Sequence, residues 1–132
     1  MTPYTFIPLL ICLLVSTSMQ QAHAKSSIDI DQKAAWLLAS CEAQISAKEP
    51  SALVLEKDAD ESLKTHHIFM QYLQRNYSKA DIEFFLAQML YYIDNWQENK
   101  KNIPNLSEAL EYCRGQLFPL IHKRYGMERE QK

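Results

Sequence analysis

LLASCEAQI, residues 37–45, places a cysteine in the middle of an apolar helical stripe, and the rest of the fold can be worked out from it. Apolar residues here recur at the i, i+3, i+4 and i+7 positions that form one face of an α-helix. The pattern predicts a first helix from about Asp31 to Lys48, closed by Pro50. Its apolar face comprises Ala34, Leu37, Leu38, Cys41 and Ile45. The Cys41 thiol therefore faces the core, which raises the question of its partner.

The first 24 residues have the pattern of a cleaved export signal. Residues 5–19, TFIPLLICLLVSTSM, are apolar or small, and they lead to the small-x-small triplet Ala22-His23-Ala24. The firmly apolar part, residues 6–15, is only about half of the roughly 20 residues that a membrane-spanning helix needs. We expect a signal peptide over 1–24 and a single helical domain over 25–132 with no membrane span. The predicted location is the periplasm, with extracellular secretion as the alternative.

The charges exclude one class of partner. The chain has 14 Lys and Arg, 16 Asp and Glu and a formal charge of −2, and every charged residue lies at or after Lys25. The two signs are mixed along the sequence, whereas binding to phosphates requires a clustered basic face. We therefore expect no nucleic acid among the partners.

The three cysteines reduce to one pair, because Cys12 lies in the predicted leader and leaves Cys41 and Cys113. An even pair in an exported protein predicts a disulfide, since an oxidising compartment forms and keeps such bonds. The alternative, a reactive or metal-binding thiol pair, lacks a C-x-x-C spacing or an adjacent histidine that could lower a thiol pKa. A bond closing a loop of this length stabilises a domain by about 4 kcal/mol.

The fold class predicted from the whole pattern is all-α. Only two glycines are present, and no run alternates polar with apolar residues as a strand would. Further helices are expected from Asp58 or Asp60 to about Asn76, from Lys79 to about Lys100, and from Asn105 to Tyr125. The expected architecture is a small four-helix bundle or an orthogonal helical array, with the disulfide joining the first helix to the last.

Local signals place the helix ends and the buried faces. Ser78 with Asp81 predicts a capping box at the start of the third helix. Pro119 predicts a kink near Gly115, and Gly126 is the expected C-terminal cap. The short run SALVL, residues 51–55, is expected to cover part of the core. The predicted apolar stripes of the second, third and fourth helices are Leu63, His66, Phe69, Met70, Leu73 and Tyr77; Ile82, Phe85, Leu86, Met89, Ile93 and Trp96; and Leu106, Leu110, Cys113, Leu117, Leu120 and Ile121.

The sequence predicts no catalytic residue and no cofactor. Serines occur without a G-x-S-x-G elbow, and paired carboxylates occur only in ordinary charge patterns. His66 and His67 are weak candidates for a metal site, because consecutive helical residues point about 100° apart, whereas two helical ligands usually lie at i and i+4. We interpret His66 as a core histidine with a hydrogen-bond partner, and His67 and His122 as surface residues.

The third helix gives the main indication of function. Its segment FFLAQMLYYI is apolar most of the way round, which is typical of a helix buried on several sides or of one with a second contact surface. Phe84 and Tyr91 project away from the core stripe, and Tyr72 of the second helix also points away from its own stripe. Such aromatics favour a protein interface. The alternative is that the SALVL segment covers them.

The leading functional hypothesis is a non-catalytic exported protein that binds another protein through Phe84, Tyr91 and Tyr72. Neutralising a toxin or hydrolase, as an immunity or inhibitor protein does, and assisting an exported assembly are examples of such a role. The alternative is a metal- or cofactor-binding helical bundle centred on His66 and His67. A small hydrolase would need a concentrated polar pocket, which the sequence does not indicate.

Overall fold

The computed structural model describes the backbone of residues 15–126 and the side chains of residues 28–126. Residues 1–14 of the predicted leader lie outside the described residues, as do the side chains of its cleavage triplet and the tail from residue 127. The chain divides into two compact units, Met1–Lys33 and Ala34–Lys132.

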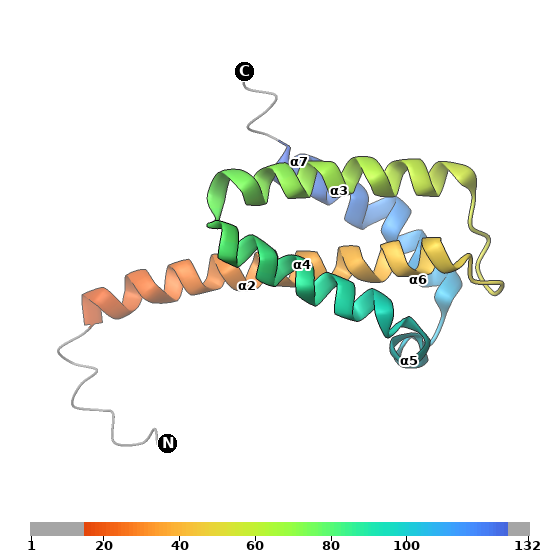
Figure 1. Ribbon diagram of the computed structural model, residues 1–132, viewed down its shortest axis with the longest axis horizontal. Helices are drawn as coiled ribbons and strands as arrows, with labels where there is room; N and C mark the ends of the chain where they lie inside the picture. The colour runs from red at the N-terminus through yellow and green to blue at the C-terminus, as the bar shows by residue number, and fades with distance from the viewer. Residues whose placement is uncertain (1–14, 127–132) are drawn as a thin grey trace. The chain divides into compact units, whose positions relative to one another are not determined.

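Every regular element in residues 15–126 is helical, which confirms the predicted all-α class. Within the second unit, α3 runs antiparallel to the C-terminal half of α2, α4 turns back from α3, and α7 packs along α3 (Figure 1). The elements are α2 (Val15–Ala47), α3 (Glu56–Asn76), α4 (Lys79–Asp94), α5 (Trp96–Asn99), the 3₁₀ turn η1 (Lys100–Asn102), α6 (Leu106–Tyr112), the π-helix η2 (Cys113–Leu117) and α7 (Phe118–Tyr125).

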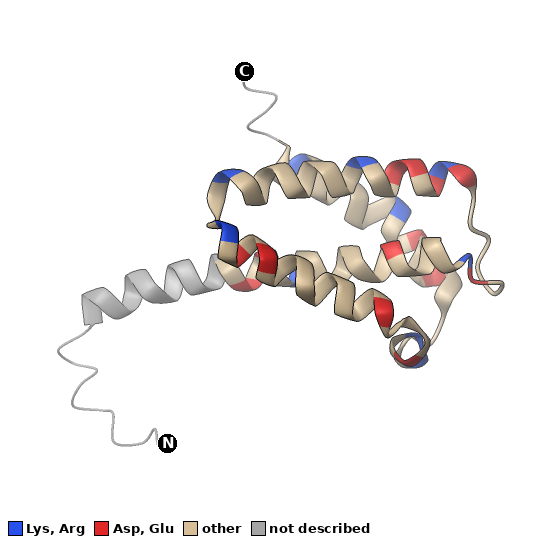
Figure 2. Ribbon diagram, in the orientation of Figure 1, with Lys and Arg blue, Asp and Glu red and all other residues tan. Residues whose placement is uncertain are grey.

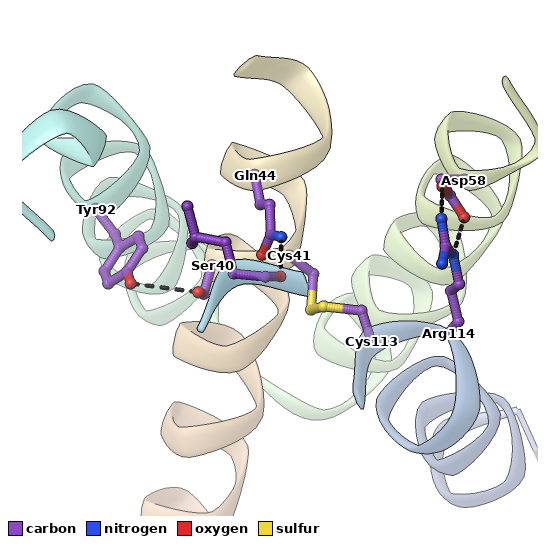
Figure 3. Close-up of a disulfide and its surroundings, with 8 residues drawn as sticks. Ser40, Cys41, Gln44, Asp58, Tyr92, Cys113 and Arg114 are labelled. Atoms are coloured by element: carbon purple, nitrogen blue, oxygen red, sulfur yellow. Dashed lines mark hydrogen bonds and ion pairs between the residues drawn. A yellow bond between two sulfur atoms is a disulfide. The ribbon is translucent and has the colours of Figure 1, made fainter. Parts of the chain in front are cut away.

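The predicted disulfide joins the first helix to the last. Cys41 of α2 and Cys113 at the start of η2 are bonded across 72 residues of sequence, with their Cα atoms 6.0 Å apart (Figure 3). Both cysteines are buried within the apolar core. Three leucines of the two stripes, Leu38, Leu110 and Leu117, are almost fully buried. The bond therefore crosses the centre of the core.

Helix α3 begins earlier than expected and turns a partly polar face inward. It starts at Glu56. Asp58 is the third residue of the helix, and its carboxylate accepts a hydrogen bond of 2.7 Å from the backbone N–H of Leu55. Asp58 therefore caps the N-terminus of α3 from within its first turn. The predicted position, directly before the first residue of the helix, is occupied by Leu55. The buried face comprises Asp58, Ser62, Thr65, Phe69 and Leu73. Leu63, predicted to be in the core, is exposed, because the polar contacts of this face fix the rotation of α3.

The joint between α3 and α4 has one of the two hydrogen bonds of the predicted capping box. The Ser78 Oγ accepts from the backbone N–H of Asp81 at 3.2 Å, and α4 starts at Lys79. The helix ends at Asp94, before the expected end near Lys100, and α5 follows in a new direction (Figure 1). The break brings Trp96 into the core, where its indole N–H donates to buried Glu49 at 2.7 Å.

The predicted kink in the last helix takes the form of a π-helix. Residues Cys113–Leu117 have the hydrogen bonds of a π-helix, which join residues five apart. One of them runs from the backbone N–H of Phe118 to the carbonyl of Cys113. The wider turn accommodates Pro119, which lacks an N–H and would press on the carbonyl of Gly115 in a regular α-helix. One extra residue in the turn rotates everything after it by about 100°. Phe118 and Tyr125 are consequently buried, and Leu120, predicted to be in the core, is exposed.

Gly126 is the C-terminal cap, as predicted. Its backbone N–H donates to the carbonyl of His122 at 3.0 Å. Its φ of −93° lies in the right-handed region, so the cap does not use the left-handed conformation that favours glycine. That conformation occurs instead at Lys48, with a φ of 52°, at the end of α2.

Candidate functional site

Helix α4 has two apolar faces on opposite sides. Phe85 and Met89 are buried against the core. On the other side Phe84, Leu90 and Tyr91 are 53%, 59% and 67% exposed. Between Glu83 and Asp94 the helix has no charged residue, so its middle is uncharged on every side (Figure 2). We call the exposed residues Ala80, Phe84, Ala87, Leu90 and Tyr91 the outer face of α4.

The segment that was the alternative explanation for this face lies elsewhere. Ala52 is buried, but Leu53 is 76% exposed, and its carbonyl accepts from the Arg114 guanidinium at the start of η2. The SALVL segment therefore packs beside the last helix and leaves Phe84 and Tyr91 uncovered. Sequence alone left this open, because it could not place the connection between α2 and α3 in space.

Tyr72 belongs to a different surface feature. Its ring is half-buried and packs on Tyr125 with a centroid distance of 4.5 Å and on Tyr77 at 6.3 Å. The residue also lines an open depression of about 450 Å³ between α3 and α7. None of the residues lining this depression belongs to α4; they are Tyr72, Leu120, Lys123, Arg124 and Tyr125. The structure thus brings Phe84 and Tyr91 together on one helix face but does not join Tyr72 to them.

His66 forms a close pair with a carboxylate of the first helix. Its Nδ1 lies 2.7 Å from Oε2 of Glu42. This hydrogen bond raises the pKa of His66 above its ordinary value of 6.5, and it outweighs the effect of burial, which acts in the opposite direction. The hydrogen bond ties α3 to α2, and it becomes an ion pair when the imidazole is protonated. The predicted hydrogen-bond partner of His66 is thus Glu42.

The pair lies in an open cavity of about 420 Å³. Ser46 and Ser62 contribute hydroxyl groups to its lining, and Leu63 contributes an exposed apolar side chain. His67 is exposed, and its ring is nearly perpendicular to that of His66 at a centroid distance of 6.4 Å. Within the described residues, no group of three or more His, Cys, Asp or Glu is arranged to hold a metal ion.

His122 is not the solvated residue predicted from the sequence. Its Nε2 lies 2.9 Å from Oγ1 of Thr65, which is fully buried in α3. The rotation that η2 imposes on α7 turns this histidine toward α3. The contact joins the two helices in the middle of their shared interface.

A buried charged pair was also missed by sequence reasoning. Arg114 donates from Nε and Nη2 to the two carboxylate oxygens of Asp58, both at 2.8 Å (Figure 3). This hydrogen-bonded pair holds the pKa of Asp58 below its ordinary value of 3.8. The residues are 56 positions apart, and no local spacing could have linked them. A buried charge so fully paired has a structural role, because it fixes α3 against η2.

None of the helices in the described part of the chain is long and apolar enough to cross a membrane. Comparison with protein-family models, with curated proteins and with solved structures finds no match to this chain.

Proposed function

We propose that this is a non-catalytic exported protein that binds another protein through the outer face of α4. The observation that carries the proposal is the exposure of Phe84, Leu90 and Tyr91 on a helix whose opposite face is buried in the core. Large apolar side chains clustered on one face remain in water only at a free-energy cost, and burying aromatics in an interface recovers it. The residues make no contribution to the core, so packing does not account for them.

The proposed location is the periplasm. The disulfide in the core indicates a non-reducing environment, and the leader-like residues 1–24 indicate export. The cleavage triplet at residues 22–24 resembles a bacterial site, which favours the periplasm over secretion from a eukaryotic cell. Within that compartment, a small binding protein suits the neutralisation of a toxin or hydrolase, or assistance to an exported assembly.

The test removes the two aromatics that extend furthest into solvent. The double substitution Phe84→Ala and Tyr91→Ala should abolish capture of the partner from an envelope extract and leave helical content and the thermal midpoint unchanged. A matched control replaces two exposed leucines outside both surfaces, Leu53→Ala and Leu63→Ala, and should keep full capture. Separate substitution of Tyr72 shows whether the depression between α3 and α7 contributes.

Two results would contradict the proposal. Unfolding of the Phe84 and Tyr91 variant would mean that both residues support the core. Equal capture by this variant and by the wild-type protein would mean that the outer face of α4 is not the docking surface.

A further inference from the structure

Small and large residues alternate along the outer face of α4. Ala80, Phe84, Ala87 and Tyr91 follow one another at intervals of four, three and four residues, and all four are exposed. These intervals are those of the seam along which two α-helices pack side by side. An alanine in such a seam lets a second helix approach closely and leaves room for a large side chain from it.

We propose that this face pairs with the same face of a second copy of the chain, with the two α4 helices antiparallel. When the two-fold axis passes midway between residues 84 and 87, Phe84 lies opposite Ala87 of the second copy. The same register places Tyr91 opposite Ala80 of the second copy. Each large side chain therefore meets a small one, and symmetry repeats both contacts.

A parallel pairing of the two helices would not fit. It would place Phe84 opposite Phe84 and Ala87 opposite Ala87, which overfills one layer of the seam and leaves a void in the next. The two aromatics and the two alanines are complementary only when the chains run in opposite directions.

One charge in the seam favours the same orientation. Asp94 follows Tyr91 by three residues and so continues the seam. A parallel pairing would place Asp94 opposite its own copy, and like charges held close together in an interface are destabilising. The antiparallel register separates the two carboxylates, because it places Asp94 at the level of Tyr77.

This inference rests on the proposal that the outer face of α4 is a docking surface, and it identifies a second copy of the chain as one protein that docks there. One pair of 16-residue helices covers less than the roughly 800 Å² per partner of a standard interface, so the dimer is expected to be weak. Self-association and capture of another protein through this face would then compete. The free protein would cover its own apolar face until a partner displaces the second copy.

Sedimentation equilibrium of the oxidised full-length domain, purified without a tag, tests the pairing over concentrations of about 1 μM to 1 mM. The wild-type protein should move from one to two copies within this range. Phe84→Ala should weaken the dimer about tenfold by leaving a void opposite Ala87, and Ala87→Phe should weaken it similarly by opposing two phenyl rings.

The decisive variant combines the two changes. Phe84→Ala with Ala87→Phe exchanges the large and small residues across the two-fold axis, so each phenyl ring again faces an alanine. Dimerisation should return to within about threefold of the wild-type constant. The control Leu120→Ala removes an equally exposed apolar side chain from α7 and should leave the constant unchanged.

Two outcomes would overturn the pairing. The first is a wild-type protein that stays a single copy across the range, and the second is a double exchange no better than either single variant. Loss of partner capture by Phe84→Ala with Tyr91→Ala, together with a monomeric wild-type protein, would overturn this inference alone and leave the docking surface standing. Retained capture together with a monomeric protein would overturn both.

Discussion

At the scale of single residues, the described part of the chain is held together by polar groups buried where two helices meet. Asp58 is 2% exposed and accepts two hydrogen bonds from Arg114 as well as one from the backbone of Leu55. Glu49 is equally enclosed, between the indole of Trp96 and the ammonium of Lys100. Each carboxylate has a cationic partner more than 50 residues away in the sequence, so each pair favours one arrangement of its segments over others.

Removing the Arg114 side chain should therefore lower the free energy of unfolding strongly. Arg114→Met leaves the Asp58 carboxylate buried without its cation, and we expect a loss of about 3 kcal/mol in the free energy of unfolding. Urea denaturation followed by circular dichroism measures it. Glu111→Gln is the control, because Glu111 also pairs with Arg114 but is well exposed, and its loss should be below about 0.5 kcal/mol.

The pair of Asp58 and Arg114 should also make the free energy of unfolding depend on pH in the acidic range. The pKa of Asp58 is lowered in the folded protein, so its contribution is present above the ordinary value of 3.8 and is lost as the pH falls through the folded value. The free energy of unfolding of the wild-type protein should decrease below about pH 4. Asp58→Asn should flatten that decrease, and an unchanged acid slope in this variant would contradict the assignment.

The pair of His66 and Glu42 should make stability depend on pH with the opposite sign. The pKa of His66 is raised by Glu42, so the ion pair contributes fully below the ordinary value of 6.5 and is lost as the pH rises through the folded value. Unfolding measured between about pH 5 and pH 9 should therefore show stability falling through the neutral range. Glu42→Gln should remove this component, whereas His67→Asn, which changes the exposed neighbour, should retain it.

At the scale of helices, η2 is the element that determines which residues of the C-terminal segment reach the core. A regular helix through residues 106–125 would have placed Leu120 in the core stripe, as the sequence pattern predicted, and Phe118 and Tyr125 to one side of that stripe. The π-helix reverses this, and Tyr125 then packs on Phe69 with a centroid distance of 5.1 Å. The proline that forces the wider turn is therefore also responsible for the aromatic contact between α3 and α7.

The two glycines of this segment should respond to alanine in opposite ways. Gly115 is exposed in η2, and an added Cβ would meet no atom within 4 Å, so Gly115→Ala should raise the free energy of unfolding by up to about 1 kcal/mol. Gly126 is buried, and a Cβ there would lie 2.5 Å from the carbonyl oxygen of His122. Gly126→Ala should therefore lower the thermal midpoint, and destabilisation by both substitutions would mean that η2 needs glycine for its backbone.

The sequence predicted those features of the fold that depend on neighbouring residues. The start of α4 at Ser78, the core stripe with Phe85 and Met89, and the helix interrupted near Gly115 all follow from spacing, capping chemistry or the ring of proline. The rotation of α3 did not, because it depends on Arg114 and His122, which lie more than 50 residues away. For the candidate site, the opposite faces of α4 could be predicted from its helical wheel, but their exposure depended on where the SALVL segment packs.

At the scale of the whole second unit, one covalent bond joins two segments that lie far apart in the sequence. The Cys41–Cys113 link spans 72 residues and lies between the helices that begin and end the unit. Two hydrogen bonds lie near the disulfide. The side-chain amide of Gln44 donates to the carbonyl of Leu106, and the hydroxyl of Tyr92 donates to the hydroxyl oxygen of Ser40 (Figure 3). Gln44 thus ties α2 to α6 and Tyr92 ties α4 to α2, beside a bond that lies within the apolar core.

Loss of the bond should therefore remove a large share of the stability. Cys41→Ala with Cys113→Ala should lower the free energy of unfolding by about 4 kcal/mol, because the unfolded chain gains the conformational freedom that the closed loop denied it. That amount is comparable with the whole stability of many small domains. Chemical denaturation measures it, and the oxidised and the reduced wild-type protein should differ by a similar amount. The single variants Cys41→Ala and Cys113→Ala should each lose as much as the double variant, since either one abolishes the same link. If the reduced protein unfolded at the same denaturant concentration as the oxidised one, the packing of α2 against α6 and η2 would have to be held by the noncovalent contacts alone.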